Sequence, residues 1–341
     1  MKNIFVIILL GLFWLSCGKE QSINWFPGSF QEALDKPEDQ IIMIDFFTDW
    51  CVWCKNLDKD TFSHPAVIKL SKQFVNIKIN AEVGAGVDIA KQYNVSGFPS
   101  IVFISKQGQE IDRIPGYLPP EQFVVRQQEI LDGHNTIIDL QNRYARNPND
   151  LEVAISLAEK HENSGKIKEA SNIYHSVVEH YPNDSSEVVN SARYFVASES
   201  LLNGSTDGLF SFIEQHSSSQ FIYNAYEQLV RYFGFIKDTT KEVKAFKDWI
   251  SLYPNDASVL NGYAWRMSEL EVNLEDALEK SRLAVVLANQ NPKHQAQIID
   301  TEAEILWKLG ESEKAIDAIE RAIAIEPENT YFQQQKEKFR Q

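Results

Sequence analysis

The alternation of apolar and polar positions divides this chain of 341 residues into two regions. In the first region, short runs rich in β-branched and aromatic residues alternate with segments of helical period, which predicts strands and helices in turn. The predicted strands are 41–47 (IIMIDFF), 75–80 (VNIKIN), 100–105 (SIVFIS) and 110–115 (EIDRIP). The predicted helices are 51–60, 66–74, a short helix that ends at residue 93, and 119–131.

The order of these elements predicts a layered α/β domain. The first two strands are separated by helices, so we expect them to be parallel, whereas the turn KQGQ at 106–109 joins the last two strands as an antiparallel hairpin. The helix at 119–131 closes the region and has proline at its start. Parallel strands followed by an antiparallel pair, with helices on both faces, are typical of an α/β fold.

After about Asn135 the strand signals stop and the pattern becomes helical. The motifs NPND (147–150), YPND (181–184 and 253–256) and EPEN (326–329) recur, and their prolines are 34, 72 and 73 residues apart, or one period and two double periods. This spacing indicates helix hairpins of the tetratricopeptide-repeat type, an all-α solenoid. We predict five hairpins beginning near residues 151, 186, 223, 257 and 296, with the second degenerate, Glu242 at a position where Ala is expected, and TYFQQQKEKFR as a polar capping helix.

The first residues predict export. One Lys precedes an apolar run from Ile4 to Leu15, which is too short for a membrane span of roughly 20 residues and is typical of a secretory signal. Ser16 before Cys17 resembles a bacterial lipoprotein signal, in which the Cys becomes the acylated first residue, although Trp14 stands where a Leu-like residue is usual. A plain cleaved signal and an uncleaved anchor stay open as alternatives. Each of them places the protein outside the cytoplasm, where disulfide chemistry is possible.

Composition narrows the classes of partner. The sequence is 43% apolar and 24% charged, as in a globular protein, and its net charge is −15. Both regions are acidic, which argues against nucleic acid or an anionic membrane surface as a partner.

Cys51 and Cys54 form a C-x-x-C pair where a predicted strand gives way to a helix. A structural zinc site needs four ligands, and the sequence has no second C-x-x-C or H-x-x-H pair, so we expect no metal. A purely structural disulfide would close a very small loop and would remove little entropy from the unfolded chain. The remaining interpretation is a redox-active dithiol.

The positions of the two cysteines predict different roles. Cys51 lies at the helix N-terminus, where free N–H groups and the helix dipole favour a thiolate, so we expect it to be the attacking, more exposed and more acidic thiol. Cys54 lies one turn deeper and resolves the mixed disulfide. Asp45 points inward from an apolar strand, so burial should raise its pKa and allow it to relay a proton to or from Cys54. Asp58 is either a second acid–base group or a solvated charge beside Lys55.

A second motif, Gly97-Phe98-Pro99, precedes the third predicted strand. It predicts a tight turn in which the X-Pro bond is cis, or else an ordinary strand that begins with proline.

Residues 24–135 resemble the C-terminal periplasmic domain of the bacterial transmembrane disulfide reductase DsbD and related thioredoxin-like lipoproteins. The motifs that carry the resemblance are DWCVWCK, TFSHPAV, VNIKINAEV, YNVSGFPS and GQE. The resemblance implies a thioredoxin fold in which Cys51 is the nucleophile, Cys54 the resolving thiol and Asp45 the buried carboxylate. It also implies that Pro99 is a cis-proline beside the dithiol and that the backbone of Phe98 pairs with a substrate strand.

Two features depart from that family. Trp53 replaces the small residue that is common at the second central position, which affects redox potential and partner choice, and the membrane-embedded electron conduit has no counterpart here. We expect Trp50 and Trp53 to contribute to substrate binding together with Phe98 and Pro99.

These observations predict a signal peptide at 1–16 with Cys17 acylated, a thioredoxin-like domain at 24–135 and helical repeats with a cap at 147–341. The predicted function is an exported thiol–disulfide oxidoreductase, with reduction favoured, in the periplasm or at the cell surface and lipid-anchored to a bacterial membrane. We expect a disulfide-bearing protein substrate, a membrane electron donor, a protein partner bound by the repeats, and no cofactor. The competing hypothesis is a scaffold or assembly lipoprotein in which the dithiol is secondary.

Overall fold

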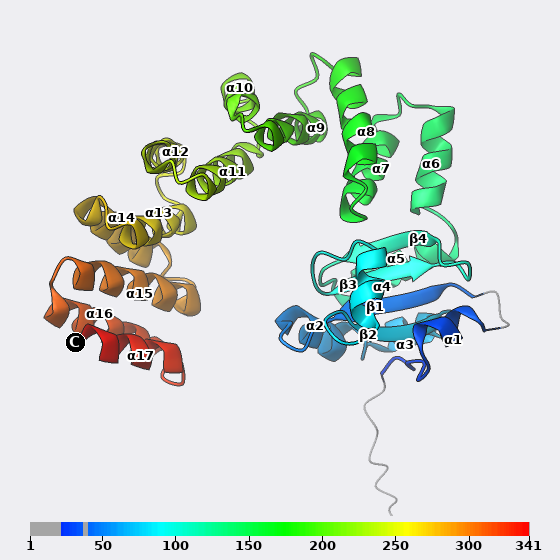
Figure 1. Ribbon diagram of the computed structural model, residues 1–341, viewed down its shortest axis with the longest axis horizontal. Helices are drawn as coiled ribbons and strands as arrows, with labels where there is room; N and C mark the ends of the chain where they lie inside the picture. The colour runs from blue at the N-terminus through cyan, green and yellow to red at the C-terminus, as the bar shows by residue number, and fades with distance from the viewer. Residues whose placement is uncertain (1–21, 37–39, 341) are drawn as a thin grey trace, which may run out of the picture. The chain divides into compact units, whose positions relative to one another are not determined.

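The computed structural model describes residues 22–36 and 40–340. The chain forms two compact units that divide between Asp184 and Ser185 (Figure 1). Strands occur in the first unit, which also contains three helices that follow the α/β region. The predicted fold class, a thioredoxin-type α/β region followed by helices, is confirmed.

One mixed sheet of four strands organises the first unit. The strands are β1 (Ile42–Phe47), β2 (Val75–Asn80), β3 (Ser100–Ile104) and β4 (Glu110–Pro115). Their order is β2-β1-β3-β4; β1 is parallel to β2 and antiparallel to β3, which pairs antiparallel with β4. The predicted pairing directions are therefore confirmed, and the predicted bounds differ from these by at most one residue.

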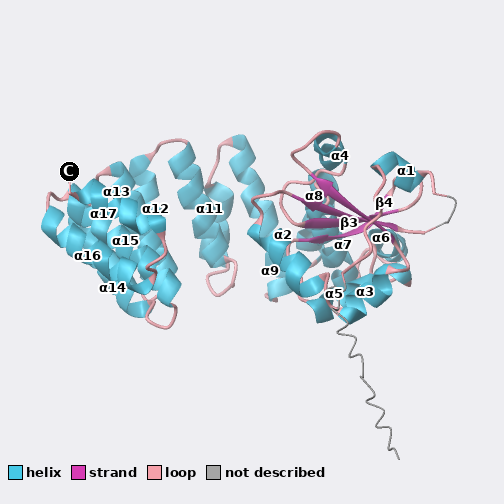
Figure 2. Cartoon of the chain, turned by 90° about the horizontal axis from the view of Figure 1, so that it is seen from below, coloured by secondary structure: helices cyan, strands magenta, loops and turns pink. Residues whose placement is uncertain are grey.

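Helices lie on both sides of the sheet (Figure 2), and alternation of side chains along the strands gives it two apolar faces. Ile42, Ile44 and Phe46 pack toward α1 (Phe30–Leu34), which the sequence pattern did not predict, and α4 (Gly86–Gln92). Met43 packs on the opposite face with residues of η1, α3 and α5. These elements are η1 (Leu57–Thr61), α3 (Pro65–Ser71) and α5 (Pro120–Leu131).

The helix predicted at 51–60 is two elements. An α-helical turn, α2 (Val52–Asn56), continues into the π-helical segment η1, where the backbone N–H of Phe62 donates to the carbonyl of Leu57 at 2.8 Å. The wider π-helical turn changes the direction of the side chains that follow it. Asp58 lies in this turn, so the direction of its side chain could not be predicted from α-helical spacing alone.

Three helices complete the first unit: α6 (Ile137–Arg146), α7 (Leu151–Asn163) and α8 (Ile167–His180). The recurring NPND, YPND and EPEN motifs lie where helices begin. The side chains of Asp150, Asp256 and Asn329 are N-caps that accept hydrogen bonds from backbone N–H groups of α7, α13 and α17. The repeat period in the sequence is therefore, in large part, a period of helix capping.

The second unit is entirely helical in its described residues. Its elements are α9 (Glu187–Ser198), η2 (Glu199–Asn203), α10 (Asp207–Gln215), α11 (Ile222–Phe235), α12 (Thr239–Leu252), α13 (Ala257–Leu270), α14 (Leu274–Leu287), α15 (Pro292–Lys308), α16 (Ser312–Ile325) and α17 (Thr330–Phe339). The five predicted hairpins are α7–α8, α9–α10, α11–α12, α13–α14 and α15–α16. The predicted helix at the end of the repeats is α17. The last hairpin begins at Pro292, four residues before the predicted start, because Asn291 caps α15.

Glu242 explains one imperfect repeat. It is buried at a position where the repeat pattern expects Ala, and the guanidinium of Arg266 donates to its carboxylate from Nε at 2.6 Å. Gly234 provides the space, since a Cβ there would lie 3.0 Å from the Glu242 Oε1 atom. The ion pair with Arg266 and the absence of a side chain at Gly234 thus accommodate a large charged residue where the repeat usually has a small one.

The predicted signal and Cys17 lie outside the described residues. Within residues 22–36 and 40–340, no helix is both long enough and apolar enough to cross a membrane.

Candidate functional site

The two cysteines lie where β1 passes into α2. Cys51 is the N-cap residue of α2, and its Sγ accepts a hydrogen bond from the backbone N–H of Cys54 at 3.0 Å. Cys51 and Cys54 are joined by a disulfide. A backbone N–H aimed at Cys51 Sγ, together with the N-terminal end of the helix, is an environment that stabilises a thiolate at this sulfur.

The expected difference in exposure between the cysteines is absent. Cys51 is 3% exposed and Cys54 is 4% exposed. In this disulfide form the two sulfur atoms are bonded to each other at the same turn, so both share one environment. Their positions relative to the helix terminus still distinguish them, because only Cys51 caps α2.

An exposed tryptophan directly precedes each cysteine in the sequence. Trp50 is 64% exposed; its indole N–H donates to Glu82 at 3.0 Å, and its ring meets Phe98 edge to face at 6.1 Å between centroids. Trp53 is also exposed and packs against Tyr117 at 5.6 Å between centroids. The structure adds Glu82 and Tyr117 as their partners, which the sequence motifs did not indicate. We call Trp50, Trp53, Phe98 and Tyr117 the rim of the dithiol.

The Phe98–Pro99 peptide bond is cis. Pro99 directly precedes β3, and its carbonyl accepts a hydrogen bond at 2.8 Å from the backbone N–H of Gly116, which follows β4. This bond ties the residue before β3 to the residue after β4. Phe98 contacts Trp50, so the Pro99 loop and the segment before Cys51 lie side by side.

Asp45 is buried in β1, the strand that precedes Cys51. It lies on the sheet face of Met43, where η1, α3 and α5 pack, and it is 1% exposed. Its Oδ1 atom has no hydrogen-bond partner among the described residues. Burial raises the pKa of Asp45 to about 7, with Lys78 opposing the shift and Asp58 adding to it. A carboxyl group with this pKa exchanges a proton readily near neutral pH.

Lys78 links the two carboxylates that the sequence singled out. It lies opposite Asp45 in the β1–β2 register, and its Nζ is 3.4 Å from Asp45 Oδ2. The same ammonium forms an ion pair with Asp58, whose side chain is exposed. Asp58 therefore pairs with Lys78 and stays exposed to solvent, and both interpretations of it, a second acid–base group or a solvated charge, stay predictions.

Sequence reasoning missed Lys78, although a signal was present. VNIKIN contains one charged side chain in an otherwise buried strand, and parallel pairing of this strand with IMIDFF places that charge beside Asp45. A lone Lys and a lone Asp in neighbouring buried strands are expected to pair, because each charge is costly to bury alone.

Together these residues provide the elements of thiol–disulfide exchange. A sulfur at a helix N-terminus can act as nucleophile, and a second thiol within one turn can displace it. A buried acid with a pKa about 7 lies on the adjoining strand. The individual roles of Cys51, Cys54, Asp45 and Asp58 remain predictions, as do those of Trp50, Trp53, Phe98 and Pro99.

Comparison with known proteins gives an independent result for this region. Residues 30–127 match the family profile described as "Thioredoxin-like domain". The thiol:disulfide interchange protein DsbD of Escherichia coli K12 is 38% identical over 96 residues, which is 27% of this chain and 17% of that protein. This chain therefore aligns with less than a fifth of that relative, so the activity of the whole relative is not transferred by the match.

Solved structures are similar to both regions. A putative disulphide-isomerase from Bacteroides thetaiotaomicron is 30% identical, and the similarity covers 34% of this chain and 98% of that structure with a TM-score of 0.31. The tetratricopeptide-repeat protein YrrB is 16% identical, with 58% of this chain and 97% of that structure covered at a TM-score of 0.41.

The sheet order, the disulfide at the N-terminus of α2, the Pro99 loop and the sequence match all concern the same segment. Residues 30–127 of this chain form a thioredoxin-like domain related to that of the DsbD thiol:disulfide interchange proteins.

Proposed function

We propose that the protein is an exported thiol–disulfide oxidoreductase that reduces disulfides in partner proteins. The observation that supports this most strongly is the combination of the Cys51–Cys54 disulfide at a helix N-terminus with Asp45, whose pKa is raised to about 7 by burial on the adjoining strand. A structural disulfide would need neither the helix terminus nor a buried acid that titrates near neutral pH.

The proposed reaction starts from the reduced dithiol. The Cys51 thiolate attacks one sulfur of the substrate disulfide, which forms a mixed disulfide and releases the other substrate sulfur as a thiolate. Cys54 then loses its proton to Asp45 and attacks Cys51 Sγ, which forms the Cys51–Cys54 bond and releases the second substrate thiolate. Two electrons pass from the protein to the substrate, and both substrate thiolates are protonated.

The other parts of the chain fit the same proposal. The reduced dithiol must be regenerated by a dithiol donor, which we place in the membrane because Cys17 would anchor the chain there after acylation. The helical hairpins would bind a protein partner, since stacked hairpins provide a long surface for contacts. The location would be the periplasm or the cell surface.

A redox titration of the protein against the glutathione couple tests the activity. The Cys51–Cys54 pair should reach equilibrium as a single two-electron couple, within the range of about −270 to −120 mV that thioredoxin-fold proteins cover. The reduced protein should then reduce insulin disulfides, and the Cys54→Ser variant should accumulate a mixed disulfide at Cys51. A dithiol that fails to equilibrate with glutathione would contradict the proposal and favour a scaffold.

A further inference from the structure

A groove in the first unit has one wall from the thioredoxin-like region, including Phe98, and one wall from the first helix hairpin. Its volume is about 560 Å³. Val87, Val95 and Phe98 line it from the thioredoxin-like region, and Glu162, Gly165 and Ile167 line it from the first helix hairpin. Most of the lining is apolar, with Glu162 and Lys91 as its charged members. Ile167 and Val87 are each 46% exposed, so apolar surface is open to a ligand on both sides.

The groove is continuous with the rim of the dithiol. Phe98 lines the groove and also contacts Trp50, the residue immediately before Cys51. A polypeptide whose cysteine is bonded to Cys51 can therefore pass along Phe98 into the groove. An extended chain advances about 3.3 Å per residue, so a few residues next to the bonded cysteine are enough to reach it.

The hairpin wall is held in place by hydrogen bonds at the turn between α7 and α8. The guanidinium of Arg113 in β4 donates to the carbonyls of Asn163 and Tyr93 at 3.0 and 2.6 Å. The amide of Asn94 donates to the Ser164 carbonyl at 3.2 Å, and the Ser164 hydroxyl donates to Glu110 at 2.9 Å. The turn is thus fixed to the loop that leads to Phe98 and Pro99.

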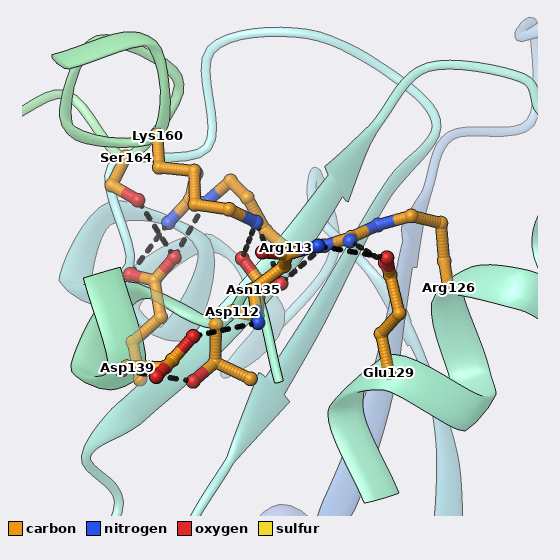
Figure 3. A network of polar contacts seen from close by, with 10 residues as sticks. Asp112, Arg113, Arg126, Glu129, Asn135, Asp139, Lys160 and Ser164 are labelled. Carbon is orange, nitrogen blue, oxygen red and sulfur yellow. Dashed lines mark hydrogen bonds and ion pairs between the residues drawn. The ribbon is translucent and has the colours of Figure 1, made fainter. Parts of the chain in front are cut away.

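A buried ionic contact strengthens the same attachment. Lys160 of α7 donates to both carboxylate oxygens of Asp112 in β4 at 2.6 and 2.8 Å, and Arg126 pairs with Asp112 from α5 (Figure 3). Asp112 is fully buried. Removing one partner of such a buried pair is strongly destabilising, so the hairpin is a firm part of this unit.

Gly165 allows the turn to approach the thioredoxin-like region closely. Its φ of +69° lies in the left-handed region, and a Cβ at this position would lie 2.7 Å from the Cβ of Asn94. Glycine is the residue that satisfies both conditions without strain. The close approach brings Ile167, two residues later, to the edge of the groove.

We propose that this groove binds an extended apolar segment of the substrate protein next to the cysteine under attack, and that Ile167 of the helix hairpin determines this preference. The inference rests on the proposed function. Continuity with the dithiol rim favours a segment of the covalently bound substrate over an unrelated ligand. The apolar lining favours Val or Leu side chains, because burying them removes apolar surface from water.

The test uses the full chain with Cys54→Ser, which retains Cys51 as a single reactive thiol in the pair. The protein is first bonded to glutathione at Cys51 and then equilibrated with one of two peptides, each with a single cysteine. One peptide has Val and Leu on both sides of its cysteine, and the other has Ser and Gly there. Peptide thiol displaces glutathione, so each equilibrium constant counts one disulfide formed against one broken.

We expect the apolar peptide to be preferred by about tenfold, which is a conservative value for burying two apolar side chains. Ile167→Glu should reduce the preference to about twofold or less, because a charge would replace apolar surface in the groove. Ile138→Glu is the matched control: Ile138 is 39% exposed near the start of α6, in the same unit, and does not line the groove. It should keep the full preference.

Three outcomes decide the proposal. An unchanged preference in Ile167→Glu would overturn the groove inference, and a preference lost equally in Ile138→Glu would overturn it as well. If Ile167→Glu fails to fold, Val87→Glu on the opposite side of the groove supplies the same comparison. Failure of the parent protein to form a mixed disulfide with either peptide would instead contradict the proposed function.

Discussion

Two buried aspartates on the same sheet show how similar burial leads to different chemistry. Asp45 in β1 is 1% exposed and Asp112 in β4 is 0% exposed, and each lies near a lysine. Lys160 contacts both oxygens of Asp112, and Arg126 adds a second ion pair. Lys78 lies 3.4 Å from one oxygen of Asp45, and the other oxygen has no partner among the described residues.

The difference lies in how completely each charge is compensated. Burial raises the pKa of Asp112, and the charges of Lys160 and Arg126 oppose the shift by pairing with this carboxylate. Lys78 is shared with Asp58 and compensates Asp45 less, so burial raises the pKa of Asp45 to about 7. A satisfied buried carboxylate holds elements together, whereas an incompletely satisfied one changes its protonation state near neutral pH.

Asp112→Ala should have the largest effect. The change leaves the ammonium of Lys160 without its carboxylate in a largely buried position, so we expect a loss of about 3–5 kcal/mol in the free energy of unfolding. Urea unfolding of the full chain, followed by tryptophan fluorescence, measures it. Asp132→Ala, at an exposed position on the C-cap of α5, should change the value by less than about 0.5 kcal/mol. A loss below about 1 kcal/mol for Asp112→Ala would mean that the Asp112 network contributes little to stability.

Asp45→Asn should have the opposite sign in alkaline solution. The pKa of Asp45 is raised from 3.8 to about 7, so the folded state binds more protons than the unfolded state between these values, and stability falls as the pH rises through this window. Above it, the ionised carboxylate costs about 4 kcal/mol relative to the neutral group, since one unit corresponds to about 1.4 kcal/mol. The Asn variant should therefore be more stable at pH 8 by up to about this amount and nearly unchanged at pH 4.

The same variant sharpens the proposed role in catalysis. An amide cannot accept a proton, so exchange with insulin should slow by about 100-fold under conditions in which Cys54 must lose its proton. The rate of insulin reduction, measured for the wild type and for Asp45→Asn at several pH values, tests this. Higher stability at pH 8 combined with slower exchange would distinguish a proton relay from a packing role; equal exchange rates at every pH would contradict the relay.

The sequence predicted the elements that depend on local pattern. The strand IIMIDFF carries a strong signal, because a run of apolar and β-branched residues acts within a few positions, whereas Gly97-Phe98-Pro99 left a cis turn and an ordinary strand start both open. The C-x-x-C motif located the candidate site for the same reason. The capping motifs that end in Asp150 and Asp256 gave the repeat period, since a helix N-cap is also a local feature.

The missed features depend on contacts between distant segments. Lys78 meets Asp45 only through strand register, and Asp112 meets Lys160 only after the first hairpin packs against β4. No periodicity within a window of ten or fifteen residues encodes either contact. Glu242 shows the converse, since the sequence marked it as an exception but only the structure showed that Arg266 and Gly234 accommodate it.

Lys78→Met should have the smallest effect and tests the comparison directly. Lys78 lowers the pKa of Asp45, so its removal should raise that pKa further, by about one unit. The fall of stability with pH should then extend about one unit higher than in the wild type, a difference of about 1.4 kcal/mol at most. Unfolding midpoints measured from pH 4 to pH 9 follow this directly, and the carboxyl ¹³C shift of Asp45 reports the protonation state itself.

Lys69→Met, which replaces an exposed lysine of α3, is the control for the loss of one positive charge and should leave the titration of Asp45 where it is in the wild type. A lower pKa of Asp45 in Lys78→Met would show that the lysine does not compensate this carboxylate, and the contrast between Asp45 and Asp112 would then need another cause.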